Sequence, residues 1–274
     1  MKKKFHIRFN SEDEPELLRV LKENKIRFKS VQQSQHRSLI ALDIIEGGSH
    51  WSSIAPLLKP KNFRLSLNYS PKEMREAKWF SIYPTNRFGY PQPEDVWYPT
   101  HFTHKNYDFD SGIYSEQIKP FEIKDEPKTK NVFSSLYWTE EIFVKKFIIS
   151  MLNDAGITGW KKWPVLIHKT KQPSKTISQL EIMHVLHFEG VMDEHKRYVT
   201  ESGFEKYVRN SAAPYLYTNE LLNIQVDMVL SKEIFGAAKN AARICLVSKK
   251  FYDLFKQHKW MGLQFEPVHI VKSS

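Results

Sequence analysis

The sequence has a single cysteine and no long apolar run. Cys245 stands alone among 274 residues, which excludes an internal disulfide and a zinc site built from cysteines. No stretch of about 18 apolar residues is present, and no apolar segment follows the lysines of "MKKKFHIRF", so the sequence predicts neither a membrane-spanning helix nor a signal peptide. These features together predict a cytoplasmic protein in a reducing compartment.

Motifs that mark common enzyme classes are also missing. The sequence has no G-x-G-x-x-G or G-x-x-x-x-G-K-[ST] phosphate loop, no G-x-S-x-G and no H-E-x-x-H. Those patterns cradle phosphates with backbone N–H groups, expose a nucleophilic serine, or hold zinc. Their absence favours a binding protein over an enzyme, and no cofactor is indicated.

Positive charge is plentiful and unevenly distributed. The net charge is +10, and residues 1–90 carry 17 Lys and Arg against 9 Asp and Glu, whereas residues 91–274 carry 24 against 22. A positive first third attached to a nearly neutral remainder indicates an acidic partner, which could be a protein or a nucleic acid.

Hydrophobic periodicity predicts an α+β protein with two parts. In "KFHIRF" the apolar Phe5, Ile7 and Phe9 alternate with basic residues, as in a half-buried strand. Similar signals up to residue 68 give the order β-α-β-β-α-β, so residues 1–90 are expected to form a basic, ferredoxin-like domain with helices on one face. The prolines from Pro84 to Pro99 place the boundary near residue 90. Residues 91–274 then form a larger mixed α/β part, in which Thr139, Ser231 and Ser248 are expected to cap helices.

One phrase occurs twice in the larger part. "GWKKWPVLI" at 159–167 and "GLQFEPVHI" at 262–270 share Gly-x-x-x-x-Pro-Val-x-Ile, and each follows a helix-like stretch. A glycine lets the backbone leave a helix, and a proline inside a strand is confined to an edge or a bulge. The repeat therefore predicts two helix-to-strand units and carries no chemistry of its own.

The stretch from residue 79 to residue 98 combines aromatic and basic side chains near the expected boundary. Such a combination is typical of a protein-binding surface, because aromatic and arginine side chains supply most interface energy. The predicted partner-binding residues are Arg75, Lys78, Trp79, Tyr83, Arg87, Tyr90 and Trp97.

Two other readings stay open. Lys4, His6 and Arg8 could share a sheet face with Arg64 and bind phosphates, although the strand aromatics point the opposite way. In "HFTHKNYDFD", His101, His104, Asp108 and Asp110 are the residue types that bind divalent metals, and they would serve a metal-dependent enzyme if the loop brought them together.

The C-terminal stretch carries a resemblance to a known family. The sequence predicts a strand that ends in Val247–Ser248 and then an amphipathic helix. After the helix come Gly262, Leu263, Phe265, Pro267 and Val268. This region resembles the end of bacterial immunity proteins that neutralise polymorphic or contact-dependent toxins. The resemblance implies a non-enzymatic inhibitor that occludes a toxin or another acidic protein. The alternative is a nucleic-acid-associated binding protein of phage or bacterial origin.

Overall fold

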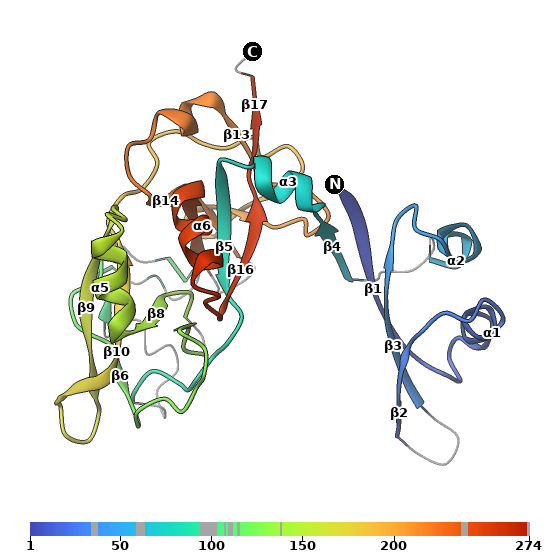
Figure 1. The fold of residues 1–274 in the computed structure, drawn as a ribbon, viewed down its shortest axis with the longest axis horizontal. Coiled ribbons are helices and arrows are strands. Elements are labelled where there is room, and N and C mark those ends of the chain that lie inside the picture. The colour runs from blue at the N-terminus through green and yellow to red at the C-terminus, as the bar shows by residue number, and fades with distance from the viewer. Residues whose placement is uncertain are drawn as a thin grey trace. The chain divides into compact units, whose positions relative to one another are not determined.

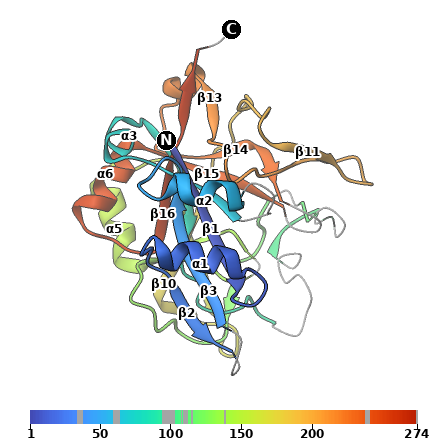
Figure 2. The ribbon, with the colours of Figure 1, turned by 90° about the vertical axis from the view of Figure 1, so that its right-hand side faces the viewer.

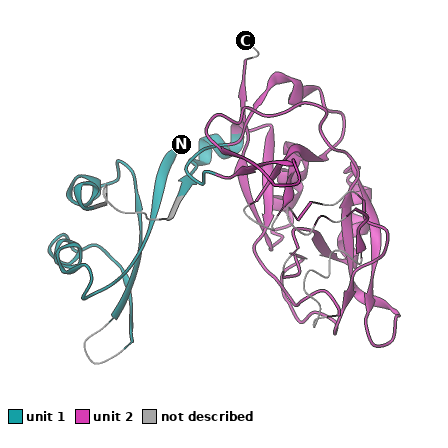
Figure 3. Cartoon of the chain, turned by 180° about the vertical axis from the view of Figure 1, so that it is seen from behind, with its two compact units in different colours: residues 1–75, 210–214 teal, residues 76–209, 215–274 magenta. Residues whose placement is uncertain are grey.

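The chain divides into two compact units. The computed structural model describes residues 1–33, 38–58, 64–93, 103–106, 108, 112–113, 116–137, 139–236 and 241–272. Unit 1 comprises residues 1–75 and 210–214, and unit 2 comprises residues 76–209 and 215–274 (Figure 3). The sequence places a boundary near residue 90, but the division lies at residues 75–76, because residues 79–84 form a strand inside the main sheet of unit 2.

Unit 1 is a four-stranded antiparallel sheet with helices on one face. Its strand order is β2-β3-β1-β4. In chain order the elements are β1 (Lys2–Asn10), α1 (Pro15–Glu23), β2 (Lys29–Gln32), β3 (Ser38–Ile45), α2 (Trp51–Leu58) and β4 (Arg64–Asn68), followed by α3 (Pro71–Glu76). Figures 1 and 2 show α1 and α2 on the same side of the sheet. The order of elements is the one indicated by the sequence, and membership of the ferredoxin-like class stays a prediction.

Alternation along the strands of unit 1 separates a core face from an open face. Ile7 and Phe9 of β1 are buried with Ile40 and Leu42 of β3. Leu17 of α1 and Ile54 of α2 close this core from the helix side. Residues one position along each strand point to the opposite face of a pleated sheet, so the helices leave that second face uncovered within unit 1.

The described residues of unit 2 form three further sheets. A six-stranded sheet has the order β11-β12-β14-β15-β5-β16, a five-stranded sheet has the order β6-β9-β10-β8-β7, and β13 pairs in parallel with β17. The strands are β5 (Trp79–Pro84), β6 (Glu122–Ile123), β7 (Phe133–Ser134), β8 (Ile142–Lys145), β9 (Trp160–Ile167), β10 (Pro173–Ile182), β11 (Lys196–Val199), β12 (Glu205–Val208), β13 (Leu216–Thr218), β14 (Met228–Phe235), β15 (Ala242–Ser248), β16 (Leu263–Pro267) and β17 (His269–Val271). The helical elements are α5 (Lys146–Asp154), the 3-10 helix η1 (Asn219–Asn223) and α6 (Lys249–Gln257). The chain is thus α+β, and no helix in its described part is long and apolar enough to cross a membrane.

One predicted helix begins later than expected, and another is a strand. The stretch after Thr139 forms β8 before α5 begins at Lys146, and the stretch after Ser231 continues β14. β8 has hydrogen-bonded neighbours on both sides, so its buried run Ile142–Val144 suits a central strand better than an amphipathic helix. The Ser231 hydroxyl accepts from the Ile244 backbone N–H at 2.9 Å, at an irregularity in the β14–β15 ladder, instead of capping a helix.

Both copies of the repeated phrase leave a helix and enter a strand. Gly159 follows α5 and precedes β9, and Gly262 follows α6 and precedes β16. Their φ angles are 95° and 112°, and a Cβ there would lie 2.2 Å from the Met228 carbonyl oxygen or 1.9 Å from that of Phe133. Two independent requirements, a positive φ and a close backbone neighbour, therefore fix glycine at both positions.

Candidate functional site

Residues 86–90 run beside residues 135–137 and are fixed by backbone hydrogen bonds. The Ser135 N–H donates to the Asn86 carbonyl at 2.9 Å, and the Phe88 N–H donates to the Ser135 carbonyl at 3.2 Å. The Tyr137 N–H donates to the Gly89 carbonyl at 2.8 Å. This ladder presents the side chains of residues 86–90 on a supported backbone, which suits a binding surface.

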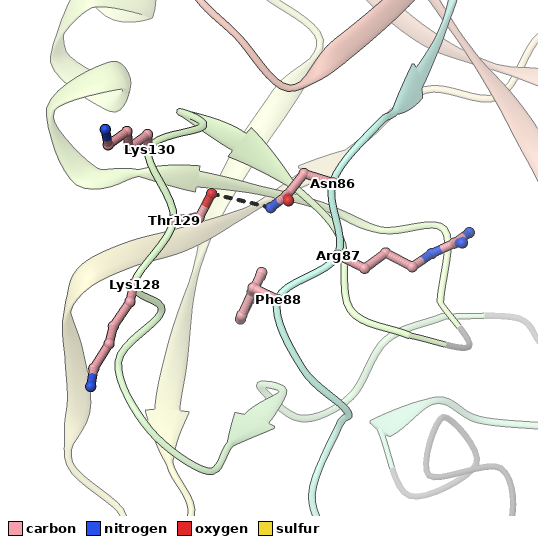
Figure 4. A pocket seen from close by; sticks show the side chains of 6 residues that line it. All are labelled: Asn86, Arg87, Phe88, Lys128, Thr129 and Lys130. Carbon is pink, nitrogen blue, oxygen red and sulfur yellow. Dashed lines mark hydrogen bonds between the residues drawn. The ribbon is translucent and has the colours of Figure 1, made fainter. Parts of the chain in front are cut away.

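An open hollow of about 420 Å³ lies along this segment. Its lining residues are Asn86, Arg87, Phe88, Lys128, Thr129 and Lys130. The Asn86 side-chain amide donates to the Thr129 hydroxyl at 3.2 Å and joins the two walls (Figure 4). Phe88 packs edge-on against Phe143 with ring centroids 5.7 Å apart, so its ring anchors the wall to the core.

Positive charge dominates the rim of the hollow. Lys128 and Lys130 are exposed and form no ion pair within the described residues. Figure 4 shows both lysines on one wall and Arg87 reaching out on the other side. Arg87 lies 3.6 Å from a Glu140 carboxylate oxygen, with both side chains about half exposed. Since exposed pairs of this kind contribute at most about 1 kcal/mol, Arg87 can exchange Glu140 for another anion.

A stacked tyrosine pair lies on the two paired segments, residues 86–90 and 135–137. Tyr90 and Tyr137 stack with ring centroids 4.7 Å apart, and Tyr137 remains 41% exposed. Tyrosine offers a large contact area with little conformational entropy to lose, so it contributes strongly to protein interfaces. The surface formed by Arg87, Tyr90, Lys128, Lys130 and Tyr137 is called the basic rim below.

The other predicted partner-binding residues have different surroundings. Arg75 of unit 1 and Lys78 of unit 2 are exposed. Trp79 is only 5% exposed and belongs to the core around the six-stranded sheet, so it supports β5 and offers no surface to a partner. The aromatic spacing that suggested a surface there reflects a buried strand. Trp97 lies outside the described residues.

Tyr83 is part of an internal cluster instead of a surface. The Arg209 guanidinium lies 5.1 Å from the ring centroid of Tyr83 and 4.8 Å from that of Tyr215, and it pairs with Glu266. The Tyr83 hydroxyl donates to that of Tyr215. Burial raises the pKa of Tyr83 to about 12. This cation–π cluster connects β5 and β16 with Arg209, the residue after β12, and Tyr215, the residue before β13, so it stabilises the packing of these segments.

The expected metal-binding residues that the structure describes, His104 and Asp108, contact different residues. The His104 ring is buried, with Nδ1 2.8 Å from the Thr103 hydroxyl and Nε2 3.7 Å from Glu141. The Asp108 carboxylate accepts from the Ser202 hydroxyl at 2.6 Å. His101 and Asp110 lie outside the described residues, and the described residues contain no cluster of three or more metal-binding side chains.

Lys128 and Lys130 are the functional candidates that the sequence did not single out. They stand in "KDEPKTK", whose mixed charges are typical of a solvated turn. Their proximity to Arg87 depends on the pairing of residues 86–90 with 135–137, which local sequence does not reveal. A scan against protein-family models finds no matching family, and a search of curated proteins finds no significant match.

Proposed function

We propose that the chain is an immunity or inhibitor protein that binds and neutralises an acidic protein partner, such as a toxin, through the basic rim. The observation that carries the proposal is an open hollow lined by three cations: Lys128 and Lys130, which form no ion pair within the described residues, stand on one wall, and Arg87 stands on the other. Cations on a rim steer an acidic partner and raise its association rate. The Tyr90–Tyr137 stack, on the segments that pair at residues 86–90 and 135–137, supplies apolar contact area.

Two further features support a binding role. Residues 86–90 and 135–137 of the basic rim are joined by backbone hydrogen bonds, so this part of the surface loses little backbone entropy when a partner docks. The C-terminal resemblance to immunity proteins points to the same kind of function, with a non-enzymatic inhibitor acting in the cytoplasm. The proposal involves no cofactor.

The test is protection of growth. The genes on either side are searched for a toxin candidate, the chain is co-expressed with it, and growth is compared with that of a double variant, Lys128→Glu with Lys130→Glu. We expect the wild type to restore growth and the variant to lose protection, because four units of charge change on the rim. The matched control is Lys169→Glu with Lys175→Glu, which makes the same change at exposed lysines of unit 2 outside the rim. Failure of the wild type to protect, or equal loss in both variants, would contradict the proposal.

A further inference from the structure

Unit 1 carries a second basic surface on its open sheet face. The strand register places Lys2, Lys4, His6, Arg8 and Asn10 of β1 on the side opposite the helix-covered core. The neighbouring strands contribute further residues to the same side. These are Lys29 and Val31 from β2, Leu39, Ala41, Asp43 and Ile45 from β3, and Ser66 and Asn68 from β4. Arg64 stands opposite His6 in the register, as the sequence predicts. We call this set the open face.

The strongest positive feature of the open face is a row across three strands. Arg8 of β1 and Lys29 of β2 both stand opposite Ala41 of β3, so they lie about 9.6 Å apart across the sheet, with a methyl group between them. Arg8 and Lys29 are exposed and form no ion pair in the part of the chain that the structure describes. The small alanine leaves a shallow floor flanked by two cations.

A polar network holds the next positions. The Lys4 ammonium lies 2.8 Å from one Asp43 oxygen, and His6 Nδ1 lies 2.7 Å from the other. His6 Nε2 lies 2.6 Å from the Ser66 hydroxyl. The order of contacts is that of a Ser–His–Asp triad, but the Asp43 side chain is 50% exposed, so the surroundings of this network are largely aqueous. The network therefore orders Lys4 and His6, and Asp43 is the one acidic side chain at the described positions of the face.

The composition of the open face selects a phosphate chain over an acidic protein. None of its described positions carries Phe, Tyr or Trp, because Phe5 and Phe9 point to the core side. Protein interfaces take much of their energy from such side chains. Side chains two apart along β1 are separated by about 6.8 Å, close to the spacing of neighbouring phosphates on an extended strand. The absence of stacking rings also predicts binding without base preference.

We propose that the open face binds the sugar–phosphate backbone of single-stranded nucleic acid, with Arg8 and Lys29 contacting phosphates across Ala41. This site is separate from the basic rim and does not depend on the proposed inhibitor function. Binding to phosphates should weaken steeply as the salt concentration rises. Each phosphate contact on a single strand contributes about −0.7 to the slope of log K against log salt concentration.

The test measures binding of the full chain to fluorescent 20-mers of dT and dA by anisotropy across a KCl series. We expect similar affinity for both, and a double variant, Arg8→Gln with Lys29→Gln, to bind about tenfold more weakly, with a salt slope flatter by ~1.4. The matched control is Arg19→Gln with Lys22→Gln, which removes two charges from exposed positions of α1 on the other side of the sheet. Its slope should stay close to that of the wild type.

A gain-of-binding variant separates the proposal from damage to the fold. Asp43→Asn removes the acidic side chain of the face and should tighten 20-mer binding several-fold. The inhibitor variant with Lys128→Glu and Lys130→Glu should keep the wild-type salt slope, so each site can fail without the other. Three results would overturn the proposal. They are an equal loss of 20-mer affinity in the two Gln double variants, no binding of the 20-mers by the wild type at 50 mM KCl, and tighter binding of poly-L-glutamate than of the 20-mers.

Discussion

Single glycines decide where the two helix-to-strand turns can form. Gly262 has a φ of 112°, and a Cβ there would lie 1.9 Å from the Phe133 carbonyl oxygen, whereas Gly203 has a φ of 83° and open space around it. Both positions disfavour side chains, but only Gly262 also faces a backbone atom that cannot rotate away. The sequence predicts the need for a helix exit at this point, and only the fold supplies the second constraint.

Gly262→Ala should therefore destabilise the protein more than Gly203→Ala. We expect a loss of about 3 kcal/mol or more in the free energy of unfolding for Gly262→Ala, because strained φ and backbone overlap combine. Gly203→Ala should cost about 1 kcal/mol, from the φ angle alone. Urea unfolding followed by tryptophan fluorescence gives both values. Equal losses in the free energy of unfolding would show that the backbone near Phe133 moves away from the added Cβ without further destabilisation.

Buried tyrosines should make stability fall at alkaline pH. Burial raises the pKa of Tyr83 and of Tyr207 to about 12, whereas an unfolded tyrosine ionises near 10. Between about pH 10 and 12 the unfolded chain loses protons that the folded chain keeps, so the free energy of unfolding decreases as pH rises.

Replacing Tyr83 should reduce this pH dependence. We expect the unfolding free energy of Tyr83→Phe to fall less between pH 9.5 and 11.5 than that of the wild type, as measured by urea unfolding at each pH. Tyr198→Phe is the control, because Tyr198 is 42% exposed, and it should follow the wild-type curve. Identical slopes for all three proteins would contradict the assignment to Tyr83.

Helix caps show where local sequence suffices and where it does not. Ser248 caps α6 as predicted, with its hydroxyl accepting from the Phe251 N–H at 3.3 Å. Ser231 lies within β14 and Thr139 precedes β8, because strand neighbours on both sides outweigh local helix propensity. The strands of unit 1 could be predicted from the alternation of apolar and polar residues, because one face of the sheet is buried and the other is open. Of the basic rim, the sequence predicts only Arg87 and Tyr90, because Lys128, Lys130 and Tyr137 join it through pairing of segments that are distant in the sequence.

Removing the α6 cap should cost a measurable amount of stability. Ser248→Ala leaves the Phe251 N–H without its side-chain acceptor and also removes a 2.6 Å hydrogen bond to Asp227. We expect a loss of about 1–2 kcal/mol in the free energy of unfolding. The control is Ser150→Ala, at an exposed position within α5, where alanine is a better helix former and no loss is expected. The cap assignment is wrong if the two variants are equally stable.

The whole chain combines two units with separate hydrophobic cores. The core of unit 1 is built around Ile7, Leu17 and Ile40, and the cores of unit 2 gather around Tyr217 and Leu246 and around Phe121 and Phe143. Cores that share no residues are expected to unfold as separate cooperative units. The uneven charge follows the same division, because residues 1–75 carry 15 Lys and Arg against 8 Asp and Glu. Stability and charge can therefore be altered in one unit at a time.

Trp51 provides a direct test of this independence. It is the one tryptophan of unit 1, and its ring lies 4.8 Å from that of Phe5 within the unit 1 core. We expect calorimetry to resolve two transitions, and Trp51→Phe to remove the fluorescence change of one while leaving the other. Trp163→Phe, in unit 2, should alter the opposite transition. The contrary result is a single transition, with fluorescence and calorimetry coinciding in all three proteins. It would mean that the two cores unfold together. The effects of charge changes in one unit would then have to be measured in both.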